Sequence, residues 1–496
     1  MKKPKGNKKP TTSKKKGDIE VPQLSGIITD ELQKLKIYLQ NSEWTLIKYM
    51  IAQGKWNGNV ALLRPPANYD ENNSSIDLGL FAYWLNNKKK LKIYNEHWMA
   101  IDSLIFLLNY YDALPKTQMT DPNYAFLQTP GNGLIYTDGS VLNAEPYATY
   151  DQEWFTAFLN LLETIRHGAW YFGDELPPID VIPINVMDQK GELKIAILGD
   201  WGTGESDAKR VMKMIQAQKP DYVIHLGDVY YSGTPDVKGT NGTIYFNPGE
   251  ETKNLLDIWP KEFAGRSFTM NSNHEMYSGA NGLIDALKKA GSPFRSQDGK
   301  TCFLLRFGGW NLLGLDSAYM SKSYTAFMDG DIGESNQAQR VWIKNLQLDP
   351  NKTIVFTHHN GFEFDGSGGT LLWNQVVDTL GGDPYAWYWG HVHNALVYKQ
   401  PISIPPAKGI PGFTTRTFAR CSGHAAIPYG NASALEGNTQ IAYRPTEVNR
   451  ANNQLYNGFN MLTLKTNRGV VTNITEEFFD LSPRTQPTWL KTLKSS

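Results

Sequence analysis

The sequence is poor in cysteine, in long hydrophobic runs and in net charge. Its 496 residues include only two cysteines, Cys302 and Cys421, so a framework of several disulfides is excluded and a reducing compartment is expected. Two buried thiols, or one bridge between them, remain as alternatives. The longest apolar stretch, residues 98–108, is interrupted by Asp102 and is too short to span a bilayer. The basic start leads into residues 17–20, Gly-Asp-Ile-Glu, and not into the apolar core of a signal peptide, so we expect a cytoplasmic protein without a membrane span.

The formal net charge is zero, but the charges are unevenly distributed. Residues 1–16 contain eight lysines and no acidic residue, which leaves 41 basic and 49 acidic residues in the rest of the chain. This acidic body argues against a dedicated nucleic-acid-binding surface, because such surfaces are basic. The lysine-rich arm has two interpretations: a disordered, solubilising tail, or a contact for RNA, ribosomes or anionic lipid.

The chain is long enough for two or three domains with a large buried core. Helical spacing of apolar residues dominates the first part of the chain, and a proline-rich boundary near residue 183 ends it. We expect four segments: a disordered lysine-rich arm (1–25), a mainly helical N-terminal domain (26–185), an α/β domain (186–482) and a C-terminal tail (483–496).

Short apolar runs characterise the α/β domain. Strand-like runs at residues 194–198 and 222–226 flank a helical stretch at 207–218, which predicts a right-handed parallel βαβ unit. Because near-continuous apolar runs are typical of strands buried on both faces, the sequence predicts a layered α/β sandwich with mixed central sheets, preceded by a mainly helical N-terminal region. Further strands are expected at 267–271, 302–307, 311–315, 353–357 and 386–389, followed by a closing antiparallel hairpin at 457–464 and 469–472.

Five polar patches follow these strands, at the carboxyl ends where open α/β sheets bind ligands. They are Gly199-Asp200-Trp201-Gly202, Gly227-Asp228-Val229-Tyr230-Tyr231, Asn273-His274-Glu275, His358-His359 and Gly390-His391-Val392-His393. Carboxylate, amide and imidazole ligands without thiolates suit cations such as Mn, Fe and Zn. Two such cations would activate a water molecule and neutralise the oxygens of a phosphate ester, so the patches predict cleavage of phosphate esters.

Each of these residue types also has a structural alternative. Asp200 and Asp228 suit helix N-caps, and Asn273 suits a turn. His391 and His393 alternate along an extended segment, so both side chains point to the same side, which favours ligation over packing.

In this order, the patches resemble the motifs of the calcineurin-like metallophosphoesterases, and they are most similar to the purple acid phosphatase branch. The motifs are Gly-Asp-x-Gly, Gly-Asp-x-x-Tyr, Asn-His-Glu, Val-x-x-His and Gly-His-x-His, and the resemblance spans roughly residues 190–480. It implies a dinuclear centre of divalent or trivalent ions, iron with manganese, zinc or a second iron, at which a metal-bound hydroxide attacks the phosphate. The implied metal ligands are Asp200, Asp228, Tyr231, Asn273, His358, His391 and His393, with Asp228 as the bridge.

The resemblance also assigns finer roles. Gly202 stands where other members carry a histidine ligand, and Tyr231 is implied to replace that histidine as a phenolate that favours ferric iron. Packing of Tyr231 in the core is the alternative. His274 is implied to face the substrate, where it protonates the leaving group or stabilises charge. His359 and His424 are candidates for the substrate pocket.

The sequence departs from the family motifs at one position. Ser272 replaces the glycine that usually precedes Asn-His-Glu, which implies a turn with less backbone freedom.

The sequence therefore predicts a metal-dependent hydrolase of phosphomonoesters or phosphodiesters, acting on a small-molecule or peptide phosphoester. The alternative is a catalytically weak or inactive protein of the same fold that serves as a binding or scaffold module through its helical N-terminal domain. Retention of every implied ligand favours the enzyme. The oligomeric state is left open.

Overall fold

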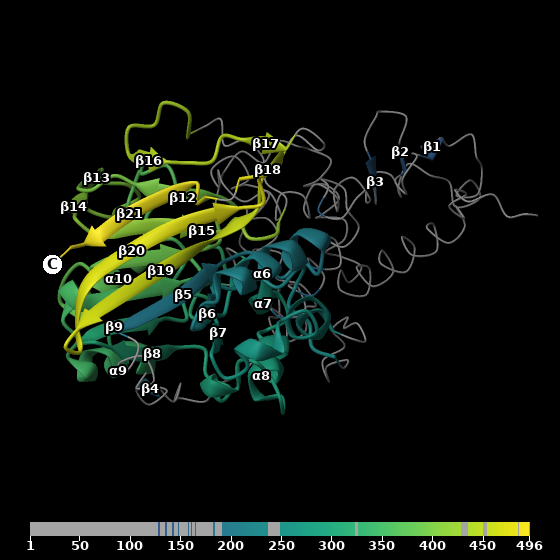
Figure 1. The fold of residues 1–496 in the computed structure, drawn as a ribbon, viewed down its shortest axis with the longest axis horizontal. Helices are drawn as coiled ribbons and strands as arrows, with labels where there is room; N and C mark the ends of the chain where they lie inside the picture. Colours follow the sequence, from purple (N-terminus) through teal and green to yellow (C-terminus); the bar gives the residue numbers. More distant parts are fainter. Residues whose placement is uncertain are drawn as a thin grey trace, which may run out of the picture.

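The computed structural model describes residues 191–236, 249–322, 326–427, 435–449, 454–484 and 486–495, with a few residues between 127 and 183 (Figure 1). The predicted lysine-rich arm and most of the predicted helical domain lie outside the described residues.

Two mixed β-sheets form the centre of the described part. The six-stranded sheet has the order β21 (Trp489–Lys494), β20 (Val470–Asp480), β19 (Gly458–Asn467), β5 (Glu192–Leu198), β6 (Tyr222–His225) and β7 (Ser267–Thr269). The eight-stranded sheet has the order β16 (Ile441–Tyr443), β12 (Ala395–Tyr398), β15 (Phe418–Ser422), β11 (Ala386–Trp389), β10 (Thr353–Thr357), β9 (Trp310–Gly314), β8 (Phe303–Phe307) and β4 (Ile182–Pro183).

The strands that precede the polar patches are parallel neighbours within each sheet. In the six-stranded sheet β5, β6 and β7 run parallel, with Leu198 opposite His225 and His225 opposite Thr269. In the eight-stranded sheet β9, β10, β11 and β15 run parallel, with Thr357 opposite Trp389. The carboxyl ends of each parallel set therefore lie at one edge of its sheet, as the predicted βαβ unit requires.

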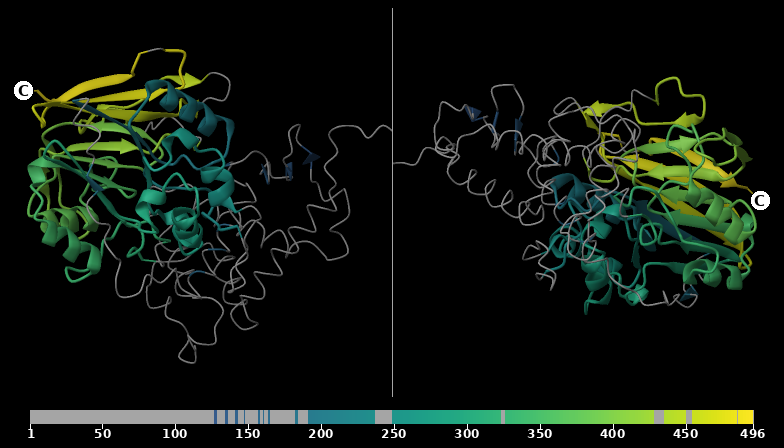
Figure 2. Two further views of the ribbon diagram at one scale, coloured as in Figure 1. Left: turned by 60° about the horizontal axis from the view of Figure 1, so that its bottom comes forward. Right: turned by 180° about the vertical axis from the view of Figure 1, so that it is seen from behind.

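The two sheets and the helices outside them form four layers (Figure 2). Three clusters of apolar side chains fill the spaces between these layers. One cluster fills the space between the sheets, including Ile195 and Phe268 from one sheet and Phe303 and Phe356 from the other. A second cluster lies between the six-stranded sheet and its helices, and a third between the eight-stranded sheet and its helices. The outer helices are α6 (Ser206–Gln218) and α8 (Asn281–Lys288) on the first side, and α9 (Ala338–Leu346) and α10 (Leu371–Leu380) on the second. The predicted layered α/β sandwich is confirmed.

Helix α6 shows how the sequence determines this layering. Its buried residues Ala208, Val211, Met212 and Ile215 recur at the spacing of one helical face. Burying an aliphatic side chain of this size contributes roughly 1.5–3 kcal/mol. The helix ends where Lys219 adopts a left-handed conformation with φ 53°.

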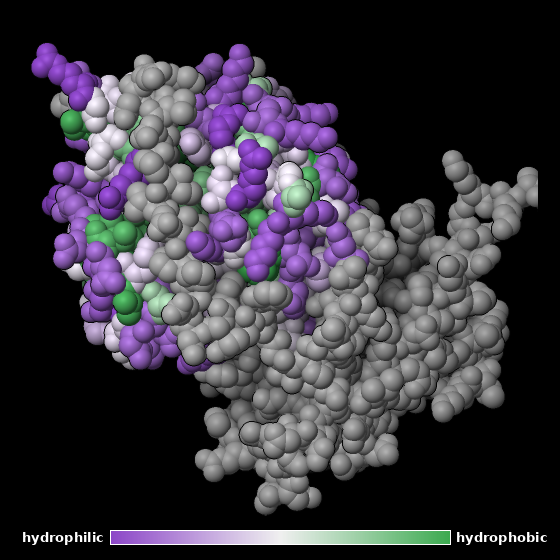
Figure 3. All heavy atoms as spheres, turned by 90° about the horizontal axis from the view of Figure 1, so that it is seen from below, coloured by the Kyte–Doolittle hydropathy of each residue, from purple (hydrophilic) through white to green (hydrophobic). Residues whose placement is uncertain are grey.

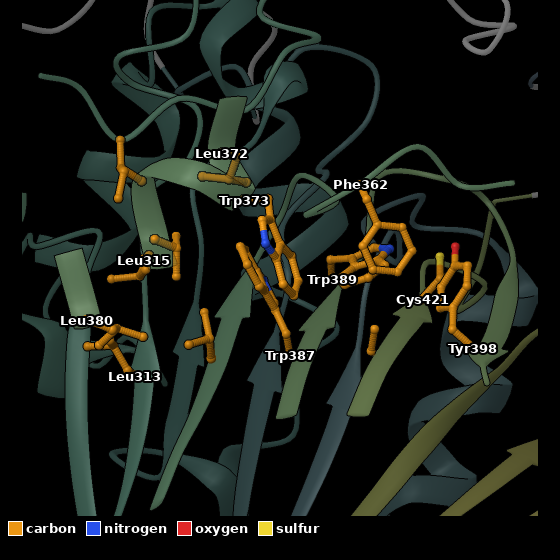
Figure 4. Close-up of a cluster of buried hydrophobic side chains, with 14 of the residues drawn as sticks. Leu313, Leu315, Phe362, Leu372, Trp373, Leu380, Trp387, Trp389, Tyr398 and Cys421 are labelled. Atoms are coloured by element: carbon orange, nitrogen blue, oxygen red, sulfur yellow. The ribbon is translucent and has the colours of Figure 1, made fainter. Parts of the chain in front are cut away.

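An aromatic cluster forms the core on the outer face of the eight-stranded sheet (Figure 4). Trp373 of α10 stacks on Trp387 of β11 with ring centroids 5.3 Å apart, and Phe362 meets the edge of Trp389 at 5.1 Å. Cys421 lies in the same cluster, and both cysteines of the chain are buried thiols. Because these rings are buried, they act as packing and not as an exposed binding wall.

A buried ion pair ties the two sheets together. Arg420 of β15 donates from Nε and Nη2 to the Glu476 carboxylate of β20, at 2.8 and 2.5 Å to Oε1. The Tyr388 hydroxyl of β11 donates to Glu476 Oε2 at 2.9 Å. Both charged side chains are almost fully buried, so each depends on the other for its stabilisation.

Where a strand range was predicted, the structure agrees with it closely, but four strands of the eight-stranded sheet were not predicted: β4, β12, β15 and β16. Strands β10 and β11 coincide with the predicted ranges, and β19 and β20 form the predicted antiparallel hairpin. The predicted C-terminal tail contains β21, which pairs with β20 and extends the sheet. The sequence analysis also left the remaining short elements unassigned: β1 (Leu127–Gln128), β2 (Leu134–Ile135), β3 (Val141–Leu142), β13 (Ile402–Ile404), β14 (Phe413–Thr415), β17 (Val448–Asn449), β18 (Gln454–Leu455), η2 (Glu251–Leu256), η3 (Lys261–Phe263), η4 (Arg295–Gln297) and η6 (Pro350–Lys352).

The described surface is mostly hydrophilic on the face drawn in Figure 3. Large hydrophobic side chains exposed in the described part are few and scattered: Val341, Leu371, Val470 and Leu490. Within that part, every helix falls short of the length and apolar character needed to cross a bilayer.

Candidate metal centre

The two sheets approach each other closely at their carboxyl ends, next to the polar patches. The Gly199 amide donates to the Ser422 carbonyl oxygen at 2.9 Å, which joins the end of β5 to the end of β15. A Cβ atom on Gly199 would lie 3.1 Å from Gly390 Cα, so glycine at this position permits the close approach. The patches that follow β5, β6, β7, β10 and β11 are thereby brought into one buried cluster.

One half of the cluster joins three of the predicted ligands. His358 Nε2 lies 2.8 Å from Asn273 Oδ1 and 3.1 Å from His391 Nδ1, and His391 Nδ1 lies 3.0 Å from Asn273 Oδ1. His358 Nε2 is also 3.2 Å from Asp228 Oδ1. These four side chains converge on one point.

The tautomer of His358 shows that this point suits a cation. Its Nδ1 lies 2.8 Å from the Leu226 carbonyl oxygen, which can only accept, so Nδ1 carries the hydrogen and Nε2 presents a lone pair. That lone pair faces the Asn273 and Asp228 oxygens, which are acceptors too. Acceptors that face one another in a buried site are stabilised by positive charge between them, so a metal ion fits the donor set.

The other half of the cluster contains Asp200, Asp228, His393 and a tyrosine. His393 Nε2 lies 3.4 Å from Asp200 Oδ1. The Tyr230 hydroxyl lies 2.9 Å from Asp228 Oδ2, 2.9 Å from His393 Nε2 and 3.4 Å from Asp200 Oδ1. Asp228 therefore directs Oδ1 to one half and Oδ2 to the other, which is the placement a bridging carboxylate needs.

The structure places the hydroxyl group of Tyr230, and not that of the predicted ligand Tyr231, among these side chains; ligation by either tyrosine stays a prediction. The Tyr231 hydroxyl instead accepts a hydrogen bond from the Tyr147 amide at 3.2 Å. Val229 pairs with Gly202 in a parallel bridge and is buried in the core, while the side chains of its neighbours Asp228 and Tyr230 meet in the cluster.

Gly202 is required for this local geometry. A Cβ atom there would lie 2.7 Å from both the Asp228 carbonyl oxygen and Val229 Cα. The motif glycine thus allows the segment after β6 to approach the segment after β5, and this approach positions Tyr230.

Three of the cluster residues adopt an unusual backbone conformation. Asp200, Asp228 and His391 have φ of 58°, 74° and 66°, in the left-handed region that non-glycine residues rarely occupy. Each such residue costs on the order of 1–3 kcal/mol, and such strain concentrates at functional sites. Asp200 helps to hold the arrangement, because its Oδ2 accepts the His391 amide at 2.9 Å.

His274 faces the cluster from α7 (Asn273–Tyr277). Its Nδ1 donates to the Tyr231 carbonyl oxygen at 2.6 Å, so the ring orientation is fixed. Its Nε2 lies 3.9 Å from Asp228 Oδ2, and its ring centroid lies 4.4 Å from that of Tyr230. Nε2 therefore points toward the Asp228 carboxylate, but it lies farther from Asp228 than His358 Nε2 and the Tyr230 hydroxyl do.

Ser272 departs from the family motif and yet fits the site. With φ −138° it adopts an extended conformation that requires no glycine. Its hydroxyl accepts the His274 amide at 3.0 Å, which caps α7, and it also hydrogen-bonds Asp228 Oδ1. The sequence analysis missed this role, although the position directly before Asn-His-Glu was a signal for it.

The two predicted pocket histidines are enclosed by protein groups. His359 Nε2 donates to the Phe327 carbonyl oxygen at 2.7 Å, and Nδ1 accepts from the Ser317 hydroxyl at 2.9 Å. His424 is buried, and its ring stacks on Phe478 with centroids 6.4 Å apart. His359 thus packs behind His391, at 4.6 Å between ring centroids, and His424 packs against Phe478 of β20.

Burial sets the protonation of the cluster. It lowers the pKa of His358 and His391, and it lowers the pKa of His393 to about 3, so these imidazoles are neutral and offer lone pairs near neutral pH. Burial opposes ionisation of Asp228, whereas a positive charge on the neighbouring His358 or His274 ring would hold the pKa of this carboxyl well below its ordinary value. Burial and then the Asp228 charge raise the pKa of Glu275 to about 8.

Comparison with known proteins gives weak structural likenesses. One matched structure is described as "GAP50 the anchor in the inner membrane complex of Plasmodium", with 13% identity and a TM-score of 0.40 over 62% of this chain and 89% of that one. Another, described as "Structure of PhoD", has 10% identity and a TM-score of 0.37 over 64% and 73% of the two chains. A hypothetical protein from Thermus thermophilus has 13% identity and a TM-score of 0.27 over 58% and 99%. No curated protein matches the sequence.

The family comparison concerns the central part of the chain. The matched segment begins in β5 and ends at the start of β12, so it contains every side chain of the cluster from Asp200 to His393. Residues 193–395 match the sequence model of the calcineurin-like phosphoesterase family.

Proposed function

We propose that the cluster binds two metal ions and hydrolyses phosphate esters of small molecules or peptides. The observation that carries the proposal is the position of Asp228, whose two carboxylate oxygens face two separate groups of ligands. Two like-charged cations at short separation require an anion between them, and Asp228 is buried with both oxygens directed into the site.

The second ion would be held by Asp228, Asn273, His358 and His391. The first would be held by Asp200, Asp228, His393 and a tyrosine, as in the purple acid phosphatase branch. Tyr230 takes the tyrosine position in this proposal because its hydroxyl lies 2.9 Å from both Asp228 Oδ2 and His393 Nε2. A phenolate ligand favours ferric iron at this position.

When bound, the two ions would supply an activated water molecule and neutralise the charge on the phosphate oxygens. The chain's own residues supply the orientation. The Leu226 carbonyl fixes the His358 tautomer, and the Tyr231 carbonyl fixes that of His274, which leaves His274 Nε2 directed toward the site. Because Nδ1 carries the hydrogen, Nε2 of the neutral ring can only accept. In the doubly protonated form of the ring, His274 is placed to give a proton or a hydrogen bond to the substrate phosphate.

Metal removal and reconstitution test the proposal. The full chain is stripped with a chelator, reloaded with Mn²⁺, Zn²⁺ or Fe, and assayed on 4-nitrophenyl phosphate and bis(4-nitrophenyl) phosphate. We expect activity only after reloading, and the preferred substrate then separates a phosphomonoesterase from a phosphodiesterase. Metal binding without hydrolysis of either ester would favour a binding or scaffold module, and full activity in the stripped protein would refute metal dependence.

A further inference from the structure

Residues from outside the matched segment pack against the loops that carry the cluster. Ala157, Asn160 and Thr164 are helical, are buried and recur at the spacing of one helical face. The Thr164 hydroxyl donates to the Tyr277 carbonyl oxygen at 2.7 Å, and Asn160 Nδ2 donates to the Ser232 hydroxyl at 2.9 Å. This part of the N-terminal region therefore rests on α7 and on the segment that follows β6.

Tyr147 extends this contact to the metal cluster. Its ring stacks on that of Tyr231, with centroids 4.8 Å apart and planes at 19°, and meets the Tyr230 ring edge-on at 5.7 Å. Its hydroxyl donates to the Thr203 carbonyl oxygen at 3.1 Å. Tyr147 is thus separated from the Asp200–Asp228–His393 group by a single side chain, that of Tyr230.

The backbone of Tyr147 indicates that its position is enforced. Its φ of 67° lies in the left-handed region, which a bulky residue rarely occupies. The contacts with Thr203, Tyr230 and Tyr231 hold it there, and the side chain remains only half-buried. Strained, partly exposed residues beside a reactive centre are characteristic of binding positions.

We infer that Tyr147 forms an aromatic wall of the active site and selects phosphate esters whose leaving group carries a planar ring. The inference rests on the proposed function, because it takes the phosphate to bind at the metal cluster. A leaving group that points away from the cluster past Tyr230 meets the Tyr147 ring, and flat rings stack favourably on one another. Tyr147 is a specificity-determining residue in this account and holds no metal.

Binding of two phosphonates to the full, metal-loaded chain tests the inference, since phosphonates carry the anion but are not hydrolysed. Removal of one stacking ring weakens binding of a planar group by roughly 5- to 150-fold. In Tyr147→Ala and in Tyr147→Leu, which keeps apolar volume without a ring, we expect a loss of this size for phenylphosphonate and almost none for methylphosphonate. Tyr147→Phe retains the ring and should bind phenylphosphonate as the wild type does.

Tyr443→Ala is the matched control, because Tyr443 is also a half-buried tyrosine but packs on Phe478 and Trp489 of the sheet. It should change neither affinity. Unchanged phenylphosphonate binding in Tyr147→Leu, or an equal loss for both phosphonates, would overturn the inference. Failure of the wild type to bind metal or methylphosphonate would instead overturn the proposed function, so the two failures are distinguishable.

Discussion

Replacement of Asp228 by asparagine tests the bridge with almost no change in shape. The residue is buried, with Oδ1 facing His358 Nε2 at 3.2 Å and Oδ2 accepting the Tyr230 hydroxyl at 2.9 Å. Asparagine keeps the volume but removes the negative charge between the two ligand groups. Its amide nitrogen cannot accept, so one half of the cluster loses a ligand atom and neither half keeps the anion.

The expected loss of metal affinity can be bounded from below. Loss of an outer partner of a metal ligand already weakens metal binding by roughly 10- to 100-fold, so loss of a direct bridging ligand should cost at least about 100-fold, or about 2.7 kcal/mol. Calorimetric titration of the stripped protein with Mn²⁺ measures this directly. A ligand that binds the folded but not the unfolded state raises the unfolding temperature. The increase in Tm on adding metal should therefore be smaller in Asp228→Asn than in the wild type.

Asp207→Asn is the matched control, because Asp207 is a partly exposed carboxylate of α6 paired with Arg210. It should leave metal affinity, metal stoichiometry and turnover unchanged. If Asp228→Asn binds two ions with wild-type affinity and retains full turnover, Asp228 is not a bridge and the dinuclear proposal fails.

Four further predictions follow from individual side chains. His274→Ala should keep its metal and lose roughly 10²–10⁴-fold in turnover, with a smaller loss for esters with good leaving groups; loss of a metal would make His274 a ligand. In the iron-loaded protein, Tyr230→Phe should abolish a visible charge-transfer band that Tyr231→Phe preserves, and the reverse result would restore the motif-based assignment. Arg420→Met leaves the Glu476 carboxylate buried without its cation and should lower the free energy of unfolding by roughly 3–5 kcal/mol, measured by denaturant titration. A decrease in the free energy of unfolding of less than about 1 kcal/mol would show that the ion pair is dispensable. Burial lowers the pKa of His225 from 6.5 to about 3, so the unfolded chain binds a proton that the folded chain excludes. The free energy of unfolding should therefore fall below pH 6.5 by about 1.4 kcal/mol per pH unit for this residue. His225→Gln should reduce that slope by the contribution of one proton, and an unchanged slope would contradict the prediction.

Much of the fold could be predicted because the central strands are short, apolar and buried on both faces. The apolar runs of β10 and β11 contain no strongly polar residue other than the terminal threonines of β10, so their ends were clear in the sequence. The structure confirms both predicted ranges. β21 was missed because its burial pattern is mostly exposed, as expected for an edge strand, and its polar sequence resembles a tail. An edge strand forms because it pairs with a neighbouring strand, in this case β20. The periodicity of its own residues does not reveal that pairing.

The candidate site could be predicted from motif order, since each motif follows a strand and the parallel strands share an edge. The structure brings Asp200, Asp228, Asn273, His358 and both histidines of the Gly-His-x-His motif into one cluster, but ligation itself stays a prediction. The structure places the Tyr230 hydroxyl in this cluster instead of that of the predicted Tyr231, because motif spacing does not encode which way the chain turns after β6. The pairing of Val229 with Gly202 decides that direction and requires coordinates.

Crystals grown with Mn²⁺ and measured for anomalous scattering test the central claim most directly. The account predicts two peaks about 3.5–4 Å apart, one bounded by Asp200, Asp228 and His393, the other by Asp228, Asn273, His358 and His391, with Asp228 touching both. A single fully occupied peak, or two peaks that Asp228 does not join, would contradict it.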